Sequence, residues 1–562
     1  MGEYRLHGPP GTGKTWTLAT VWLPKAVMRF GPEAVVVCSL TRAAARVIAA
    51  RTPELPREHV GTLHALCYRA LGQPEIAEAH LASWNAAYPA LALSGEEEGD
   101  DGLPLPAYRV ERRKATQGDL LSAEAQALRH RMVPRDSWPQ RVRYFQDRWD
   151  AWIEEEGYTD FTGLIEGCLG ESHAPGKPKV LVVDEAQDCS ALELRLIRQW
   201  GDRAAYTVLA GDGDQAIYGW RGASPQAFLG REIPPESNYH LSQSHRVPGA
   251  VHDVASRWVA SCSSRYSTSY LPTAALGSVR HLSSVTSRYP RSLLGEVLTD
   301  RREGKTSMIL ASCGYSLART LSVLRSEAVP FHCPYRPTDG AWNPLRGSGE
   351  RLRALLAADG RTGKLWTLPE LALWVEALDA QRAGLRSGAK ARVKASEAAR
   401  REAKGDADEL APAEIAHLLG STVWAQLDDA LRDQTVVEWW EARLLRRRAA
   451  ALQYPLAVYR KHGRKALTST PSVIVGTIHA VKGGEADRVY VYPDLSTSGM
   501  REWLQPGEPR DGVLRLFYVA MTRAKERLIL LGHSSPKSVP WPRRHEWTPT
   551  SGSTQDSQEP SL

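Results

Sequence analysis

The sequence feature that most constrains the fold is a loop near the start of the chain, Gly8-Pro9-Pro10-Gly11-Thr12-Gly13-Lys14-Thr15. It follows a short apolar run, Tyr4 to His7, and precedes helix-compatible residues from Trp16 to Met28. The loop matches the phosphate-binding pattern G-x-x-x-x-G-K-[ST] at every fixed position. Strand, loop and helix therefore come in the order that this pattern requires.

Each residue type in the loop suits a nucleoside triphosphate. Glycines let backbone N–H groups turn inward around an anion, the Lys14 ammonium supplies charge for the β and γ phosphates, and the Thr15 hydroxyl can reach Mg²⁺. The competing interpretation is a plain Gly/Pro-rich turn between a strand and a helix. We predict a nucleotide site formed by Gly8, Pro9, Pro10, Gly11, Thr12, Gly13, Lys14 and Thr15.

Composition narrows the class of protein. A chain of 562 residues is too long for one core, so several domains are expected. The net charge of +7 permits a polyanionic partner without demonstrating one. Seven scattered cysteines without a C-x-x-C pair argue against a disulfide scaffold and a zinc site. No apolar run approaches a membrane span and no signal sequence precedes the first strand, so we expect a soluble cytoplasmic protein without a membrane partner.

A second candidate site follows the apolar run from Lys179 to Val183 and reads Asp184-Glu185-Ala186-Gln187-Asp188. In a phosphate-loop protein, an acid at the tip of a neighbouring strand can hold the Mg²⁺ that Thr15 also touches, and an adjacent glutamate can deprotonate the attacking water. We assign Asp184 to the metal and Glu185 to the general base. An acidic helix N-cap would explain Asp184 alone but not the whole run.

Further strands are predicted at residues 34–40 and 206–210, and four more segments complete an ordered set with these two sites. They are GDGDQAIYGWRGA at 211–223, LSQSHR at 241–246, VGTIHAVKGGE at 475–485 and LFYVAMTRAK at 516–525. In this order the six segments resemble the motifs of the UvrD/Rep/PcrA family of superfamily 1 DNA helicases.

The resemblance implies a role for each matched position around ATP and Mg²⁺. Gln215 would sense the γ phosphate, Arg246 and Arg523 would act as arginine fingers, and Glu485 would bind the ribose. Read alone, each arginine would more often be a surface or helix-end cation. Contacts to single-stranded DNA would come from Thr41, Thr62, His64, Tyr218, Trp220, Arg221 and His479.

Among these residues, Trp220 would stack on a base. The alternative for Trp220 is a core side chain, since the chain has 18 tryptophans.

The resemblance also implies the architecture: an α/β protein with two RecA-like P-loop NTPase motor domains, each carrying a mainly helical insertion. The expected ranges are 1–68 and 176–245 for motor domain 1A, 69–175 for insertion 1B, 246–330 and 466–533 for motor domain 2A, 331–465 for insertion 2B, and 534–562 for a flexible tail. Residues 381–410 are so charged that they form either an exposed helix or a partly disordered segment.

Three departures from the family pattern bear on function. Only seven residues precede Gly8, where the family carries a segment that reads adenine, so we expect either a start placed too late or weak base recognition. Leu40 replaces an aromatic residue that stacks on DNA, and Gly484 replaces a leucine. Both changes leave the grip on single strands open.

The resemblance implies an ATP-dependent DNA helicase that moves 3′ to 5′ on single-stranded DNA and unwinds duplex in repair, replication or recombination. The expected partners are single-stranded DNA, single/double-strand junctions and repair or replication proteins, for a nucleoid-associated monomer or dimer. Two alternatives remain: a DNA-stimulated ATPase that translocates or recruits partners without efficient unwinding, and an AAA+ ring ATPase that remodels proteins.

Overall fold

The computed structural model describes residues 2–39, 42–94, 116–170, 173–223, 225–265, 269–334, 343–402 and 408–541. The chain forms two compact units, which we call unit 1 and unit 2. Unit 1 comprises Met1–Ser287, Met308–Ser316 and Gly476–Leu562, and unit 2 comprises Arg288–Ser307 and Leu317–Val475. Two of the crossings between units fall inside strands, in β10 (Ser307–Ala311) and β12 (Val473–Thr477).

The first sheet of unit 1 has six strands in the order β3-β2-β4-β5-β1-β6, and every pairing is parallel. Its central strands are apolar runs buried on both faces, as expected for a parallel sheet covered by helices. The bounds are β1 (Gly2–His7), β2 (Val35–Ser39), β3 (Val60–Thr62), β4 (Val180–Asp184), β5 (Tyr206–Gly211) and β6 (Asn238–His240), which confirms the strands predicted from the sequence.

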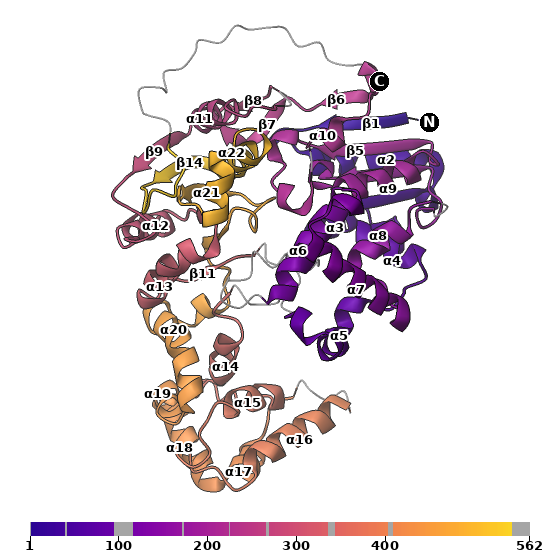
Figure 1. The fold of residues 1–562 in the computed structure, drawn as a ribbon. Coiled ribbons are helices and arrows are strands. Elements are labelled where there is room, and N and C mark those ends of the chain that lie inside the picture. The colour runs from indigo at the N-terminus through magenta and orange to yellow at the C-terminus, as the bar shows by residue number, and fades with distance from the viewer. Residues whose placement is uncertain are drawn as a thin grey trace. The chain divides into compact units, whose positions relative to one another are not determined.

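Alternating side chains of β2 enter two different cores, because neighbouring residues of a strand face opposite sides. Val35 and Val37 pack with Leu18, Leu23 and Ile48 from the helical segments α1 (Lys14–Thr17) to α3 (Arg42–Arg51). The other face packs against α4 (Leu63–Ala70), α8 (Phe161–Gly167) and α9 (Ala191–Gly201). The sheet and its covering helices α2 and α9 can be followed in Figure 1.

The helix after the phosphate loop differs from the continuous one expected over residues 16–28. The chain forms α1, a π-helical turn at Leu18–Trp22, and then α2 (Leu23–Phe30). Pro24 lies in the first turn of α2 and carries no backbone N–H, so the regular hydrogen-bond ladder is interrupted here.

A second parallel group in unit 1 contains β9 (Ser278–Leu282), β14 (Ala524–Leu531) and β13 (Ala486–Val491). Strand β10 lies beside β13 in this sheet. The Tyr492 N–H, directly after β13, donates to the Leu310 carbonyl of β10 at 2.9 Å. Helices α11 (Gly249–Val259), α21 (Thr497–Leu504) and α22 (Glu508–Met521) accompany these strands. The mixed α/β fold with parallel sheets is consistent with two RecA-like motor domains, as predicted.

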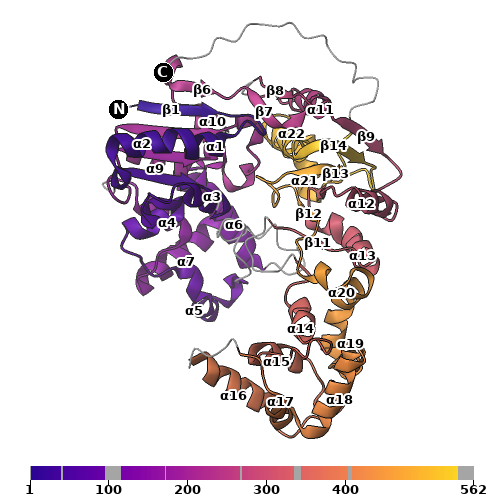
Figure 2. The same ribbon diagram turned by 180° about the vertical axis from the view of Figure 1, so that it is seen from behind.

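The segment between β3 and β4 is mainly helical (Figure 2). It has its own aromatic core. Trp84, Trp138, Trp149 and Trp152 are buried there together with Phe145. Its longer helices are α5 (Leu81–Ala87), α6 (Gln117–His130) and α7 (Gln140–Glu156). Most of the acidic stretch 94–101 lies outside the described residues.

Unit 2 contains the short parallel pair β11 (Phe331–His332) and β12, with helices before and between these strands. The Trp366 and Trp374 rings lie 4.9 Å apart inside the helical part. The helices are α12 (Leu293–Arg302), α13 (Ala318–Ser326), α14 (Ser348–Leu355), α15 (Leu368–Val375), α16 (Ala389–Glu402), α17 (Pro412–Leu419), α18 (Ser421–Arg432), α19 (Val436–Glu441) and α20 (Arg446–His462).

The helices bear on two predictions from the sequence: an exposed helix or partly disordered segment at 381–410, and no membrane-spanning run. The charged stretch 381–410 contains the helix α16, while residues 403–407 lie outside the described ranges. Across the described ranges, no helix is both long enough and apolar enough to cross a membrane.

Candidate nucleotide and nucleic-acid site

The phosphate loop joins the carboxyl end of β1 to α1. Its first residue is fixed to the sheet, since the Gly8 N–H donates to the Gly211 carbonyl at the end of β5 at 3.1 Å. Gly11 and Gly13 have φ values of 77° and 82°, a left-handed conformation that glycine adopts without strain. The glycines of the motif therefore shape the loop as the sequence pattern requires.

Lys14 folds back across this loop and donates a hydrogen bond to the Gly8 carbonyl. A Cβ atom on Gly8 would lie only 2.1 Å from Lys14 Cγ, so a larger residue at position 8 would displace the lysine. The ammonium thus lies within the loop, where the motif predicts phosphate binding.

Strand β7 (Gln243–Pro248) packs directly on the phosphate loop. The His245 N–H donates to the Gly11 carbonyl at 2.9 Å, and Ser244 Oγ donates to the Pro10 carbonyl at 2.8 Å. Arg246 follows in the same strand, and its Nε is buried without a hydrogen-bond partner among the described residues. Burial lowers the pKa of Arg246. An anion at the loop would satisfy this cation, as the finger assignment expects.

Asp184 ends β4 and is fully buried. Thr15 Oγ1 donates to Asp184 Oδ2 at 2.7 Å, which brings the two predicted metal ligands together. Burial, followed by the neighbouring Glu185 charge, raises the pKa of Asp184 to about 6. Hydroxyl and carboxylate oxygens are the ligands that Mg²⁺ prefers, so the donor set fits that ion.

Glu185 has a backbone φ of 57°, a left-handed conformation that is strained for a residue with a side chain. Gln187 Nε2 donates to Glu185 Oε2 at 2.5 Å, and Lys482 Nζ lies 3.7 Å from the same oxygen. Burial opposes ionisation, but the charges of Lys482 and Lys14 outweigh it and lower the pKa of Glu185 to about 2. The side chain is therefore an ionised and oriented carboxylate, and its role as general base stays a prediction.

Lys482 is a residue of the site to which the sequence analysis gave no role. Its ammonium donates to Asp188 and, at 2.9 Å, to the Gln215 carbonyl. Burial raises the pKa of Asp188 to about 6, while Lys482 opposes that rise. The cation within the segment VGTIHAVKGGE was the signal that could have identified it.

Gln215 and Arg523 are in direct contact. Arg523 Nη2 donates to Gln215 Oε1 at 3.1 Å, while Gln215 Nε2 donates to Asp212 Oδ2 at 2.6 Å. Arg523 is buried and also donates to the carbonyls of Val519 and Gly484. Burial, and then the like charge of Arg246, lower the pKa of Arg523 to about 9. The predicted sensor and one predicted finger thus meet.

Glu485 lies at the rim of this arrangement and is exposed. Its carboxylate is 3.7 Å from Lys525 Nζ. Its charge also acts on Arg246 and Arg523, where it opposes the pKa decrease caused by burial. It therefore lies near the two arginines.

Four of the predicted DNA contacts gather after the turn that contains Gln215. The Tyr218 ring lies 5.9 Å from the Trp220 ring and 5.8 Å from His479, and Arg221 lies 5.9 Å from its centroid. Tyr218 is buried, whereas Trp220 is partly exposed. The core interpretation considered for Trp220 therefore describes Tyr218 better.

Two more of the predicted DNA contacts, Thr62 and His64, lie at the start of α4. Thr62 caps α4, with its hydroxyl accepting the Ala65 N–H at 3.3 Å. The His64 ring lies 6.2 Å from Phe161. Thr41 and Leu40 lie outside the described residues.

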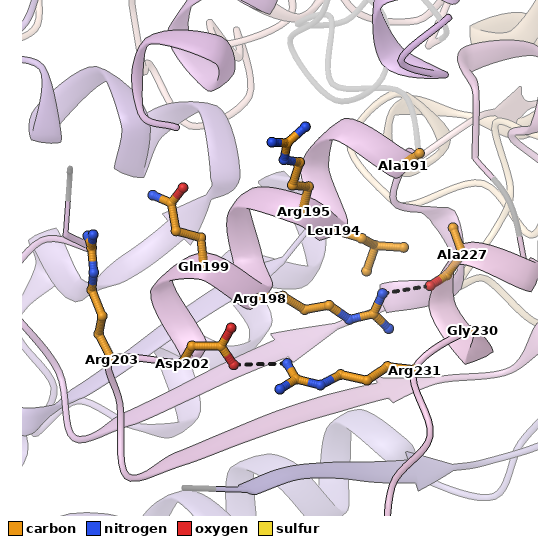
Figure 3. A pocket seen from close by; sticks show the side chains of 10 residues that line it. All are labelled: Ala191, Leu194, Arg195, Arg198, Gln199, Asp202, Arg203, Ala227, Gly230 and Arg231. Carbon is orange, nitrogen blue, oxygen red and sulfur yellow. Dashed lines mark hydrogen bonds and ion pairs between the residues drawn. The ribbon is translucent and has the colours of Figure 1, made fainter. Parts of the chain in front are cut away.

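A shallow hollow of about 830 Å³ on unit 1 is distinct from the nucleotide site (Figure 3). Its arginines reach the amino end of β1, because Arg198 Nε donates to Glu3 Oε2 at 3.1 Å, whereas the phosphate loop follows the carboxyl end. The lining residues come from α9, α10 (Pro225–Leu229) and the loops after them: Ala191, Leu194, Arg195, Arg198, Gln199, Asp202, Arg203, Ala227, Gly230 and Arg231.

The loop, the paired carboxylates and the two arginines define a P-loop NTPase with a second RecA-like half. Two family models match the chain: residues 3–221 match an AAA domain, and residues 456–535 match the UvrD-like helicase C-terminal domain. With the six ordered motifs, these findings show that the chain belongs to the UvrD/Rep-like superfamily 1 helicases.

Similar curated proteins bear related names. Over 87 residues the chain is 38% identical to the ATP-dependent DNA helicase Rep of Escherichia coli K12. This aligned region covers 15% of this chain and 13% of Rep. Over 96 residues it is 36% identical to the ATP-dependent DNA helicase UvrD2 of Mycobacterium tuberculosis H37Rv, covering 16% and 14%. A Buchnera aphidicola Rep is 29% identical over 123 residues, covering 20% and 18%. Each match thus spans less than a fifth of the relative's length.

Proposed function

We propose that this chain is an ATP-dependent motor that moves 3′ to 5′ along single-stranded DNA and unwinds duplex. The observation that carries this proposal is one short segment, residues 211–221. Within it Gln215 contacts Arg523, and three residues later Tyr218 packs on His479. A change at the nucleotide therefore has a direct covalent route to the aromatic cluster.

The nucleotide chemistry follows from the side chains around the loop. The loop N–H groups and Lys14 bind the phosphates, and Thr15 and Asp184 hold Mg²⁺, which neutralises phosphate charge when bound. Glu185 orients a water molecule and accepts its proton. The two arginines, Arg246 and Arg523, stabilise charge on the transferred phosphoryl group, an effect worth about 10³ to 10⁵ in rate in related enzymes.

The DNA side of the proposal rests on the Tyr218 cluster. Partly exposed Trp220 offers a ring for base stacking, which tolerates any sequence. The neighbouring Arg221 lies 3.7 Å from the buried Glu193 carboxylate. Rep and UvrD2 are named ATP-dependent DNA helicases, which supports DNA as the substrate. Polarity and unwinding come from the family likeness.

The proposal includes a domain assignment and a cellular setting. Motor domain 1A comprises 1–68 and 176–245, insertion 1B comprises 69–175, motor domain 2A comprises 246–330 and 466–533, insertion 2B comprises 331–465, and the tail begins at 534. The protein acts as a monomer or dimer at single/double-strand junctions in the nucleoid, with repair or replication proteins.

The test is steady-state ATP hydrolysis without nucleic acid, with single-stranded DNA and with single-stranded RNA, using Glu185→Gln as the blank. We expect strong stimulation by DNA that is absent from the blank. Faster displacement of a strand from a 3′-tailed duplex than from a 5′-tailed duplex supports the polarity. Stimulation without displacement favours the ATPase that does not unwind, and an ATP-dependent hexamer on gel filtration favours a ring ATPase.

A further inference from the structure

Asp214 directly precedes Gln215 in the three-residue turn Gly213–Gln215 and is buried. Arg265 Nε donates to Asp214 Oδ2 at 3.0 Å. The other oxygen, Oδ1, is buried and has no hydrogen-bond partner in the part of the chain that the structure describes. Burial and then the charge of Asp212 raise the pKa of Asp214 to about 6, and Arg265 counters that rise. Arg265 is thus the ion-pair partner of a buried carboxylate beside the predicted γ-phosphate sensor.

The segment that carries Arg265 is fixed to the first turns of α22. Buried Asp511 accepts three hydrogen bonds from it: the Ser263 N–H at 2.9 Å, Ser263 Oγ at 2.8 Å and the Ser264 N–H at 2.9 Å. Fully buried Arg515 donates to the Ser264 carbonyl at 2.8 Å. The backbone before Arg265 therefore follows α22 as one body.

The other end of α22 reaches the same turn. Arg523 lies two residues beyond the end of this helix and donates to Gln215 Oε1 at 3.1 Å. Two neighbouring residues of one short turn, Asp214 and Gln215, are thus each held by an arginine, and both arginines are tied to α22. These two contacts hold the turn together with the hydrogen bond that Lys482 donates to the Gln215 carbonyl at 2.9 Å.

We propose that Arg265 and Asp214 form a positioning pair that holds Gln215 against Arg523 for ATP hydrolysis. This inference rests on the function proposed above and gives a role to two residues, Asp214 and Arg265, that the motif assignments leave without one. Displacing a positioned group by about 1 Å can lower a rate by about 10²-fold, so a pair without contact to substrate can still control kcat.

The first experiment measures DNA-stimulated ATP hydrolysis and fluorescent ATP-analogue binding in Arg265→Met, with Arg265→Lys as the conservative variant. We expect kcat to fall by about tenfold or more in Arg265→Met and by less than about threefold in Arg265→Lys, with analogue Kd nearly unchanged. The matched control is Arg231→Met, which breaks an exposed 2.9 Å pair with Asp202 and should leave kcat unchanged. An unchanged kcat in Arg265→Met, with or without a lower Tm, overturns the inference.

A second comparison asks whether the pair acts through Gln215. In a Gln215→Ala background, adding Arg265→Met should lower kcat by less than about twofold further, because the positioned group is already gone. The same fold loss in both backgrounds contradicts the proposed route.

A readout independent of activity separates this inference from the proposed function. The Gln215 N–H donates to the Asp212 carbonyl at 2.9 Å, and the Ala486 N–H donates to the Arg523 carbonyl at 3.1 Å. Arg265→Met should speed hydrogen exchange at both amides, and Arg231→Met at neither. If the wild-type protein shows no DNA-stimulated ATP hydrolysis, the proposed function is wrong. Hydrogen exchange at these two amides still tests whether Arg265 and Asp214 position Gln215. An unchanged exchange rate at the Ala486 amide in Arg265→Met overturns the proposed positioning pair.

Discussion

The Lys482 ammonium lies 3.7 Å from Glu185 Oε2 while it hydrogen-bonds to Asp188, so one cation serves two acids of the same turn. The two roles differ: the contact with Glu185 orients the proposed general base, whereas the bond to buried Asp188 compensates a charge. Removing Lys482 should therefore have two effects that can be separated.

We expect Lys482→Met to lower both kcat and stability. Leaving Asp188 buried and unpaired should cost about 3 to 5 kcal/mol in the free energy of unfolding, measured in urea. Adding Asp188→Asn should restore most of that stability but not kcat, because Glu185 still lacks its cation. Recovery of kcat in the double variant would show that Lys482 acts through Asp188 alone. Lys537→Met, which removes an exposed lysine bonded to Thr497, is the matched control.

The catalytic assignments predict different losses for Lys14→Ala and Glu185→Gln. Both should abolish nearly all DNA-stimulated ATP hydrolysis, with general-base loss alone worth about 10² to 10⁴ in rate. Only Lys14→Ala should also weaken binding of a fluorescent ATP analogue, because the assigned role of Glu185 is to act on water rather than to bind phosphate. Normal turnover in either variant contradicts the site.

The aromatic cluster predicts opposite outcomes for two neighbouring rings. Trp220→Ala should weaken single-stranded DNA binding by about 1 to 3 kcal/mol, or about 5- to 150-fold in Kd, with little change in Tm. Tyr218→Ala should instead lower stability by about 3 to 5 kcal/mol, because this ring is buried. Fluorescence anisotropy and thermal unfolding measure the two effects. A large Tm loss in Trp220→Ala would favour a core role for that ring.

The helical segment between β3 and β4 depends on a buried ion pair. Arg129 donates to both Asp160 oxygens, at 2.5 and 3.0 Å, and to Glu166 at 2.6 Å. Arg129→Met should lower the free energy of unfolding by about 3 to 5 kcal/mol. Unfolding can be measured by the fluorescence of the tryptophans packed around the pair. Arg141→Met, which removes an exposed pair with Glu124, should cost less than about 1 kcal/mol.

The same pair predicts a pH dependence. Burial alone would raise the pKa of Asp160, but Arg129 outweighs it and holds this pKa below its usual value. A carboxyl with a lowered pKa stabilises the fold above its unfolded pKa of about 4, and that stability is lost as the pH falls through the folded value. The difference between wild type and Arg129→Met should therefore be largest at neutral pH and shrink below about pH 4. A constant difference across this range contradicts the assignment.

The elements that the sequence predicted well are those governed by local rules. Strands β2 and β4 are apolar runs, and the glycines of the phosphate loop have the φ values that the motif needs. The contact between Thr15 and Asp184 was also predictable, because a known motif pair spans the 169 positions between them.

The parts that the sequence could not predict are pairings between distant segments for which the motifs name no partner. Asp188 and Lys482 are 294 positions apart, and Asp214 and Arg265 are 51 apart, so no local periodicity links them. The sequence did not predict the π-helical turn at Leu18–Trp22. This turn depends on the position of Pro24, which interrupts the backbone hydrogen bonds of a helix that the residue composition would otherwise continue.

The close packing of β7 on the phosphate loop restricts how this protein could be re-engineered. A Cβ on Gly11 would lie 2.7 Å from both Ser244 Oγ and Arg246 Cβ, and glycine is already favoured there by its φ. The loop and strand β7 therefore form a single design unit, although more than 200 residues separate them. A directed-evolution library aimed at a new nucleotide would need to vary both segments together.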